Sequence, residues 1–396
     1  MLVRLAYRFM SEPSLRPLWK FVRIAGWGGM RSVARFERRL RDGVVFPPFL
    51  FMSVTSRCNL RCQGCWVDVD APPAELSLEA LDRIVGGAKR HGNRFFGLLG
   101  GEPFLHPGLM DLIGRHRDCY FQVFTNGHAV TEETATRLAR LGNVSPLVSI
   151  EGNPAVSDVR RGGRDVHERT LRGLERCVRA GLVVGVSSSV CRSNFDDLVS
   201  DAWLRELVRR GVHYVWYYAY RPVGPRPCPE LALPPDRLLA LRRFLVDART
   251  RHPIVIVDAY WDADGNALCP MAVGISHHVG PTGGIEPCPV IQLAAESVGG
   301  GGDVFDLATR SAFLKDMRET AAKAGRGCVL LERPDLVREV ALRHGARDTT
   351  LRGTALEELA RMAPCGSQDL PERIPEASAL YRFAKRRWFF GFGAYG

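Results

Sequence analysis

The chain has 396 residues, of which 46% are apolar and 24% are charged, as is ordinary for a soluble globular protein. No run approaches the roughly 18 consecutive apolar residues that a membrane-spanning helix needs, and the N-terminus leads into no apolar signal-peptide core, so we expect a cytoplasmic protein. Eleven cysteines, an odd number, argue against a disulfide framework and favour reduced thiols, some of which bind metal.

The formal net charge of +11 lies at the two ends of the chain. Residues 1–45 carry +7 and residues 380–396 carry +4, so the part between them is neutral. Both ends mix arginine with tryptophan and phenylalanine. Three interpretations fit: the ends fold back onto the body with the tail lining the active site, they contact an anionic inner-membrane surface peripherally, or they bind another polyanion. We do not expect nucleic acid as a partner.

Apolar β-type runs alternate with helical patterns from residue 48 onward. The predicted strands are 49–55, 94–99, 120–125, 147–151, 182–190 and 214–220. The predicted helices are 76–91, 132–141, 167–180, 196–210 and 235–251, with Ser77 and Thr131 as N-caps of the first two. Repeated strand-then-helix units predict an α/β fold with a parallel sheet and helices outside it. Six units give a partial (β/α)6 TIM-like barrel, whose ligands bind at the carboxyl ends of the strands.

We expect four parts along the chain. A basic amphipathic segment occupies residues 1–47, and the barrel occupies residues 48–252. Residues 253–345 change character, with short β-like pieces and many Gly and Pro turns. Residues 346–396 form a helical segment with a basic aromatic tail.

Three cysteines directly follow the first predicted strand: Cys58, Cys62 and Cys65, spaced C-x3-C-x2-C. Three thiolates can hold three corners of a cubic [4Fe–4S] cluster and leave the fourth iron open for a small molecule. A structural zinc site would need a fourth ligand nearby, and the next cysteine, Cys119, lies far downstream. The spacing therefore predicts a catalytic iron–sulfur cluster.

Glycine and polar residues end the following strands, where a parallel sheet binds its ligands. The glycines let backbone approach a ligand closely, and Glu102 offers a carboxylate to an ammonium group. Each segment alone would be an ordinary turn, and only their order and common position make them a candidate site. The candidate residues are Gly100, Gly101, Glu102, Pro103, Thr125, Asn126, Ser149, Glu151, Ser187, Ser189 and Arg221.

With these segments in this order, residues 48–225 resemble radical S-adenosylmethionine (SAM) enzymes. The resemblance implies that Cys58, Cys62 and Cys65 hold a [4Fe–4S] cluster whose open iron is chelated by SAM. Residues 100–103 would contact the amino group of SAM, and Ser149, Glu151 and residues 187–189 its ribose or carboxylate. It implies reductive cleavage of SAM to a 5′-deoxyadenosyl radical that abstracts hydrogen from a substrate, with a reductase, flavodoxin or ferredoxin as electron donor.

One residue of the motif departs from the common family pattern. Gly64 stands where most members carry an aromatic residue before the last cysteine, and Trp66 follows that cysteine. This variant resembles the radical enzymes of hopanoid biosynthesis.

A second set of cysteines begins with Cys269 and Cys288, spaced C-x13-G-x4-C. This resembles the auxiliary-cluster region of the SPASM and twitch subfamilies and implies a small twitch-like C-terminal extension with one auxiliary iron–sulfur cluster. Cys328 is the candidate third ligand. The fourth is open among Cys228, Cys365, His277, His278 and the substrate. The alternative is that these cysteines are buried, unliganded thiols. Cys119, Cys177 and Cys191 are expected in the core.

These residues specify neither a catalytic acid or base nor a substrate. We favour a lipid, isoprenoid-like or other small molecule, because the segment ahead of the barrel is short for a peptide-recognition domain. The alternatives are maturation of a peptide or modification of a soluble metabolite. A different class of function is a non-catalytic iron–sulfur or metal-binding protein that transfers electrons.

Overall fold

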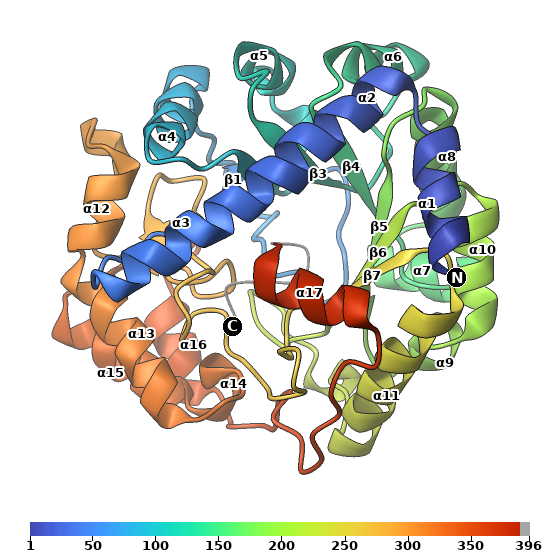
Figure 1. Ribbon diagram of the computed structural model, residues 1–396. Coiled ribbons are helices and arrows are strands. Elements are labelled where there is room, and N and C mark those ends of the chain that lie inside the picture. The colour runs from blue at the N-terminus through green and yellow to red at the C-terminus, as the bar shows by residue number, and fades with distance from the viewer. Residues whose placement is uncertain (389–396) are drawn as a thin grey trace.

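A nine-stranded sheet forms the centre of the computed structural model, which describes residues 1–388 (Figure 1). Its strand order is β7-β6-β5-β4-β3-β2-β1-β8-β9, and every neighbouring pair except β8 and β9 is parallel. The strands are β1 (Leu50–Thr55), β2 (Phe95–Gly100), β3 (Tyr120–Thr125), β4 (Val144–Ser149), β5 (Gly185–Val190), β6 (Tyr214–Ala219), β7 (Val255–Val257), β8 (His278–Val279) and β9 (Ile285–Glu286).

All six predicted strands are present, and the sheet extends beyond them at both edges. β7 adds to β6 at one edge, while the hairpin of β8 and β9 adds to β1 at the other. The predicted partial barrel is therefore confirmed. It stays open, because within residues 1–388 the edge strands β7 and β9 do not pair with each other. Nor does any helix in this range have the length and apolar character to cross a membrane.

Helices connect the parallel strands and cover the outer side of the sheet, as the alternating pattern predicts. They are α4 (Leu78–Arg90), α5 (Leu109–Arg115), α6 (Glu132–Leu141), α7 (Pro154–Arg161), α8 (Val166–Arg179), α9 (Phe195–Leu198), α10 (Asp201–Arg209) and α11 (Pro235–Arg251). The predicted N-caps are confirmed: Ser77 Oγ accepts from the Ala80 N–H and Thr131 Oγ1 from the Thr134 N–H. The predicted helix 196–210 is divided because Ser200 caps a new helix, accepting from the Trp203 N–H at 3.2 Å.

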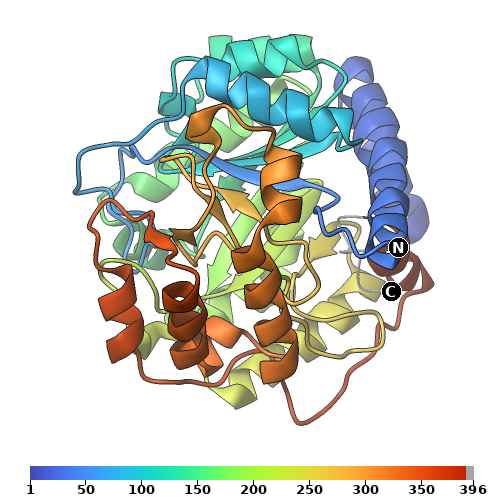
Figure 2. The same ribbon diagram turned by 90° about the vertical axis from the view of Figure 1, so that its left-hand side faces the viewer.

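The chain after the barrel forms a helical group beside the open edge of the sheet (Figures 1 and 2). Its elements are β10 (Leu293–Ala294), α12 (Val304–Arg310), α13 (Ala312–Ala324), α14 (Val329–Glu332), α15 (Pro334–Arg343), β11 (Arg347–Asp348) and α16 (Ala355–Arg361). The last helix, α17 (Ala379–Arg387), lies apart from this group. The four-part division of the chain stays a prediction, and residues 389–396 of its last part lie outside the described residues.

The N-terminal helices pack across the end of the sheet at which the parallel strands begin (Figure 1). They are α1 (Leu2–Ser11), α2 (Leu15–Lys20), η1 (Phe21–Gly28) and α3 (Gly29–Arg41). Arg8 donates to the Val212 and Pro253 carbonyls at 2.9 and 2.8 Å, and Lys20 donates to the Arg117 carbonyl at 2.8 Å. These carbonyls belong to turns that lead into strands, so the segment ties successive turns together.

The C-terminal helix α17 docks beside the N-terminal helices. Trp388 Nε1 donates to the Ala25 carbonyl at 2.8 Å, and the Tyr381 hydroxyl accepts from the Ile256 N–H at 2.8 Å. Residues 1–41 and 379–388 thus fold back onto the body, as one interpretation of the sequence expected. The described part of the tail does not line the carboxyl-terminal end of the sheet, however, so the expectation of a tail in the active site is wrong for residues 379–388.

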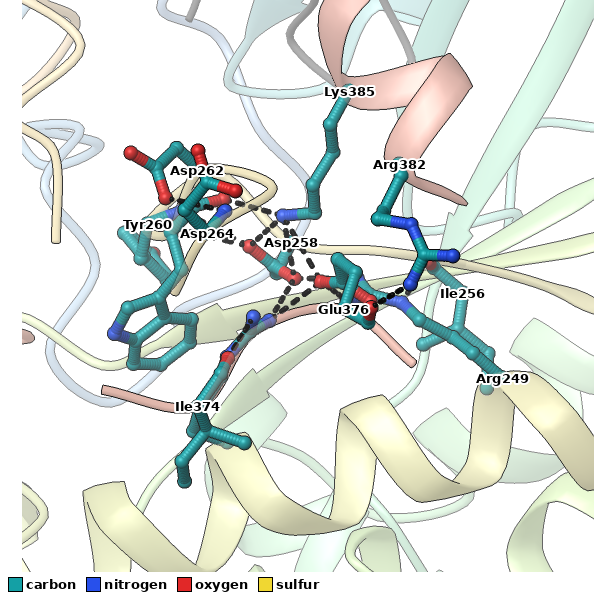
Figure 3. A network of polar contacts seen from close by, with 12 residues as sticks. Arg249, Ile256, Asp258, Tyr260, Asp262, Asp264, Ile374, Glu376, Arg382 and Lys385 are labelled. Carbon is teal, nitrogen blue, oxygen red and sulfur yellow. Dashed lines mark hydrogen bonds and ion pairs between the residues drawn. The ribbon is translucent and has the colours of Figure 1, made fainter. Parts of the chain in front are cut away.

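Five buried charged side chains link three parts of the chain: α11, the segment that follows β7, and α17 with the residues just before it (Figure 3). Arg242 and Arg249 both donate to Glu376 Oε1, at 2.7 and 2.5 Å, and Arg249 also pairs with Asp258. Lys385 Nζ lies 3.1 Å from Asp258 Oδ1. Burial alone would raise the pKa of Asp258, but Lys385 and the two arginines hold it below its ordinary value. Because each charge is out of water, each depends on its partners.

We predict that Asp258→Asn destabilises the protein by about 3–5 kcal/mol, because three buried cations then face one carboxylate. Urea unfolding at pH 7 measures this cost. Asp264→Asn is the matched control, since Asp264 pairs with Arg386 at the exposed surface, where such pairs contribute roughly 0–1 kcal/mol. Equal stability of the two variants would contradict the assigned role of the buried network.

Candidate active site

The carboxyl ends of the parallel strands surround a cavity of about 320 Å³. Because β1 to β6 run in one direction, the residues that follow each strand meet at the same end of the sheet. The predicted residues Ser149, Glu151, Ser187, Ser189 and Arg221 line this cavity. Gly64 and Trp66 of the three-cysteine loop line it too, and Cys288 of the second cysteine set lies on its wall.

The loop after β1 carries Cys58, Cys62 and Cys65. Burial raises the pKa of Cys58 to about 11 and that of Cys65 to about 12, so these two groups keep their protons at neutral pH when they are free thiols. Donors nevertheless point at the sulfurs: the Leu60 N–H lies 3.5 Å from Cys58 Sγ, and Arg161 Nη1 lies 3.7 Å from Cys62 Sγ. Such donors stabilise metal-bound thiolates.

The donor set fits an iron–sulfur cluster better than a single ion. Across residues 1–388, no three His, Cys, Asp or Glu side chains are placed to hold one metal ion. A zinc ion would need ligands that converge on one point, whereas each cluster thiolate binds a different iron. Cys58, Cys62 and Cys65 would hold such a cluster.

The Gly100–Gly101 segment lies against the backbone that leads into the cysteine loop. Gly101 N donates to the Thr55 carbonyl and Glu102 N to the Arg57 carbonyl, both at 2.8 Å. A Cβ at Gly101 would lie 2.2 Å from the Arg57 carbonyl oxygen, so only glycine allows this approach. Gly100 and Gly101 thus fix the start of the cysteine loop.

The Glu102 carboxylate is fully buried and bonded within the protein. It accepts hydrogen bonds from Thr125 Oγ1 at 2.7 Å, from the Asn126 N–H at 2.7 Å and from the Phe104 N–H at 3.1 Å. Burial raises the pKa of Glu102 to about 7, although these hydrogen bonds favour its charged form. The Asn126 side chain in turn donates to Asn59 Oδ1 at 2.8 Å. Glu102 therefore links the ends of β2 and β3 to the cysteine loop. Pro103 begins the short helix that follows (η2, Pro103–Leu105) and is buried.

A buried ion pair joins the end of β4 to the cysteine loop. Arg161, the last residue of α7, donates to Glu151 Oε1 at 2.8 Å while it contacts Cys62 Sγ. Glu151 Oε2 accepts from the Ser189 N–H at 3.0 Å, and Ser149 and Ser187 share a hydrogen bond of 3.1 Å. The sequence analysis missed Arg161, because it belongs to no motif in a chain rich in arginine.

Gly64 is required by a close neighbour, Tyr220. Its φ is +65°, and a Cβ there would lie 2.0 Å from Tyr220 Oη. Tyr220 directly follows β6, lines the cavity beside Gly64 and receives the Arg160 guanidinium over its ring at 5.1 Å. The space beside Gly64 is therefore occupied by the aromatic ring of Tyr220, from the segment that follows β6.

Arg221 lies between the cavity and the second set of cysteines. Burial would lower its pKa, but Cys328, the Tyr260 hydroxyl, Cys288 and Cys269 raise it above its ordinary value. Its guanidinium also lies over the Tyr260 ring at 5.1 Å. The structure thus places Arg221 on the side of the second cysteine set.

The four cysteines Cys269, Cys288, Cys328 and Cys365 lie in one region. Burial raises the pKa of Cys269 and of Cys365, and for both the next contribution is the neighbouring Cys328. The backbone N–H groups of Met271, Ala272 and Val329 point at the Cys269 sulfur. The antiparallel pair of β8 and β9 leads to Cys288.

Of the other candidates for a fourth ligand, Cys228 and His278 have different partners, whereas His277 Nδ1 is buried with no hydrogen-bond partner within residues 1–388. Cys228 packs with Cys191, Tyr220 and Leu231. His278 bonds to Ser53 at 2.9 Å and to Glu286 at 2.6 Å, and His277 lies near Arg318. The cysteines expected in the core, Cys119, Cys177 and Cys191, are buried as predicted.

We predict that Gly64→Ala lowers the free energy of unfolding by more than a positive φ alone costs an alanine, because the added Cβ also collides with Tyr220. Gly353→Ala is the matched control, because Gly353 has a φ of +71° but no atom within 4 Å of an added Cβ. The control should lose about 1–2 kcal/mol and Gly64→Ala about 1–3 kcal/mol more in urea unfolding. If both variants lose the same amount, the contact between Gly64 and Tyr220 is not as described.

Comparison with known proteins identifies the domain. Residues 52–197 match the Radical SAM superfamily. Pre-heme d1 synthase of Dinoroseobacter shibae is 32% identical over 156 residues, which are 38% of this chain and 38% of that protein. PqqA peptide cyclase of Streptomyces rochei is 29% identical over 259 residues, 61% of this chain and 69% of that protein. The chain thus spans well under half of the first relative's length.

The fold is similar to that of a solved structure. SuiB of Streptococcus suis, in a crystal structure bound to precursor peptide SuiA, matches with a TM-score of 0.61 at 13% identity, over 72% of this chain and 70% of that chain. Members of the Radical SAM superfamily are enzymes that use a [4Fe–4S] cluster and SAM. Because the matched segment runs from β1 through β5 and includes the three-cysteine loop, residues 52–197 form a radical SAM domain.

Proposed function

We propose that this protein is a radical SAM enzyme that modifies a peptide. The observation that carries the proposal is the cavity at the strand ends, which lies between the three-cysteine loop and Cys288 and adjoins a larger cleft. That cleft has a volume of about 750 Å³, and Trp66, Val223 and Val290 line both spaces. A flexible chain could place one side chain in the cavity and its flanking residues in the cleft.

The relatives support the peptide more than the lipid-like substrate that the sequence analysis favoured. PqqA peptide cyclase and the SuiB structure with its precursor peptide are named for peptides. None of the relatives reported above is named for a lipid, and the lipid expectation is not retained. Pre-heme d1 synthase makes a tetrapyrrole the second candidate substrate.

The residues of the site would bind and orient the reactants. When bound at Cys58, Cys62 and Cys65, the cluster would supply the electron that cleaves SAM. The hydroxyls of Ser149 and Ser187 face the cavity and offer hydrogen bonds to a ribose or carboxylate. Arg161 balances the negative charge of the thiolates, and the aromatic side chains of Phe124, Trp216 and Tyr218 on the cavity wall exclude water from reactive species.

We further propose a second iron–sulfur cluster, held by Cys269, Cys288, Cys328 and Cys365. Two hydrogen bonds hold Cys365 beside Cys328: Cys365 N donates to the Leu331 carbonyl, and Cys328 N donates to Ser367 Oγ. Arg221 would face this cluster from the cavity and offset its negative charge. The twitch-like character of the C-terminal region belongs to this proposal.

The test of the activity uses the anaerobically reconstituted full chain with SAM and a strong reductant. We expect formation of 5′-deoxyadenosine, stimulated by a peptide fraction of the host cell. Cys62→Ala should abolish the product because the cluster loses a ligand. The matched control is Cys177→Ser, a buried cysteine of α8 outside the site, which should keep the activity if the chain folds.

Treatment of the stimulating fraction with a protease separates the substrate classes. Loss of the stimulation supports a peptide. Stimulation that survives the protease and follows a tetrapyrrole or lipid extract would reject the peptide and leave the radical SAM activity standing.

The second cluster is tested by iron content and electron paramagnetic resonance. Two [4Fe–4S] clusters give about eight irons per chain, and Cys269→Ala/Cys288→Ala should leave about four. Cys365→Ala should lower the iron content or change the signal of the second cluster, whereas Cys228→Ala should do neither. An unchanged spectrum for Cys365→Ala would remove Cys365 as the fourth ligand.

A further inference from the structure

Exposed apolar side chains are concentrated on one face of the molecule. Of the twelve large apolar side chains recorded as exposed within residues 1–388, ten lie in the N-terminal helices and α17. They are Leu2, Val3, Tyr7, Met10, Leu15, Trp19, Val22, Trp27, Leu380 and Phe383. Leu15 is 85% exposed, and Trp19 and Trp27 are each 62% exposed. A patch of this kind on a folded protein marks an interaction surface.

The helical spacing aligns these side chains. Val3, Tyr7 and Met10 lie three or four residues apart in α1, and Leu15, Trp19 and Val22 repeat that spacing in α2 and η1. Trp27 follows five residues later, as the wider turn of the π-helix η1 requires. The opposite side of η1, with Phe21, Ile24 and Ala25, is buried against the body.

Both ends of the chain contribute to this face. In Figure 1 the helices α1 to α3 and α17 all lie in front of the sheet, and Figure 2 places the same helices together along one edge. An apolar recess of about 240 Å³ lies between the two segments, lined by residues that include Met30, Leu380, Phe383 and Trp388. We call the exposed side of residues 1–41 and 379–388 the terminal face.

The terminal face is strongly basic. Exposed arginines are Arg4, Arg16, Arg23, Arg31, Arg35, Arg38, Arg41, Arg382, Arg386 and Arg387. In the same segments and in the turn that leads from α3 toward the barrel, the exposed acidic side chains are Glu12 and Asp42. Glu12 is already paired with Arg8. Interfacial tryptophan, aliphatic side chains and arginine together are the composition of a surface that binds anionic lipid.

We propose that the terminal face docks onto an anionic phospholipid bilayer. Two other occupants fit less well. A second copy of the chain in a two-fold contact would bring the same arginines against each other, which like-charge repulsion disfavours. A nucleic acid offers no apolar partner for Leu15 and Val22, since its interfaces are polar.

The geometry of docking separates the bilayer from the active site. The terminal face lies where the strands begin, whereas the cavity lies at their carboxyl ends, at the opposite end of the sheet. A molecule bound in this way directs its cleft toward water. The substrate then reaches the site from the aqueous phase and is not drawn from the membrane, which is consistent with a peptide.

Vesicle flotation of the full chain tests the proposal. We expect binding to phosphatidylcholine vesicles that contain 30% phosphatidylglycerol, weaker binding at high salt, and little binding to phosphatidylcholine alone. Arg23→Gln/Arg31→Gln/Arg38→Gln should weaken binding on the order of a hundredfold. Trp19→Ser/Trp27→Ser should weaken it by at least about tenfold.

The matched control is Val159→Ser/Leu342→Ser, which changes the two large exposed apolar side chains that lie outside the terminal face within residues 1–388. This control should bind like the wild type. All variants are first compared by urea unfolding, so that a loss of binding is not a loss of folding. Absence of wild-type binding to the anionic vesicles, or an equal loss in the control, would overturn the proposal.

Sedimentation without vesicles distinguishes a second copy as the occupant. A wild-type monomer supports the bilayer. A dimer that Trp19→Ser/Trp27→Ser converts to a monomer would assign the terminal face to self-association and overturn docking to lipid.

Discussion

Parallel pairing of the strands is the constraint on which the rest of this structure depends. After each strand the chain returns through a helix to the end of the sheet where the strands begin. All carboxyl ends of the strands, with the polar residues that follow them, therefore meet at the opposite end of the sheet. Cys58, Glu102, Asn126 and Glu151 follow four different strands and come from segments far apart in the sequence. Hydrogen bonds then join the loops that carry these residues, as between Asn126 and Asn59. The site is a consequence of the direction of the strands.

The cysteine loop is held from several sides by buried polar contacts. Gly101 and Glu102 fix where it begins, and α7 supplies Arg160, whose guanidinium donates to the Gln63 carbonyl at 2.9 Å. Arg161 places a positive charge beside Cys62. These contacts lie within the protein and restrain the loop, which lowers the conformational cost of holding a cluster in one geometry. The same principle applies to Cys328 and Cys365, which are joined through Ser367 and Leu331.

The two ends of the sheet serve different purposes. The cavity and both cysteine sets lie at the end of the sheet formed by the carboxyl ends of the strands. The end at which the strands begin is covered by the N-terminal helices and α17. The buried charges of Arg249, Asp258, Glu376 and Lys385 fix α17 in place, so its exposed side chains are presented by a rigid element. A surface at one end can therefore bind a partner without obstructing the cleft at the other.

The sequence by itself determined the elements and the chemistry of the three-cysteine loop. Apolar periodicity located the strands and most helices, and local rules predicted the caps Ser77 and Thr131, because both depend on neighbours in the chain. The motif spacing likewise indicated an iron–sulfur loop without a structure. Gly64 was visible as a departure from the pattern, but its reason was not.

Only the tertiary structure decided which distant side chains complete the site. Tyr220 fills the space beside Gly64, Arg161 reaches Cys62, and Cys365 lies beside Cys328, none of which follows from spacing along the chain. Similarly, the basic ends could have lined the cavity, and only their packing against the starts of the strands placed them on the opposite face. Such contacts join residues about a hundred or more positions apart, or segments that no local periodicity relates, and only three-dimensional packing of the sheet and its helices can determine them.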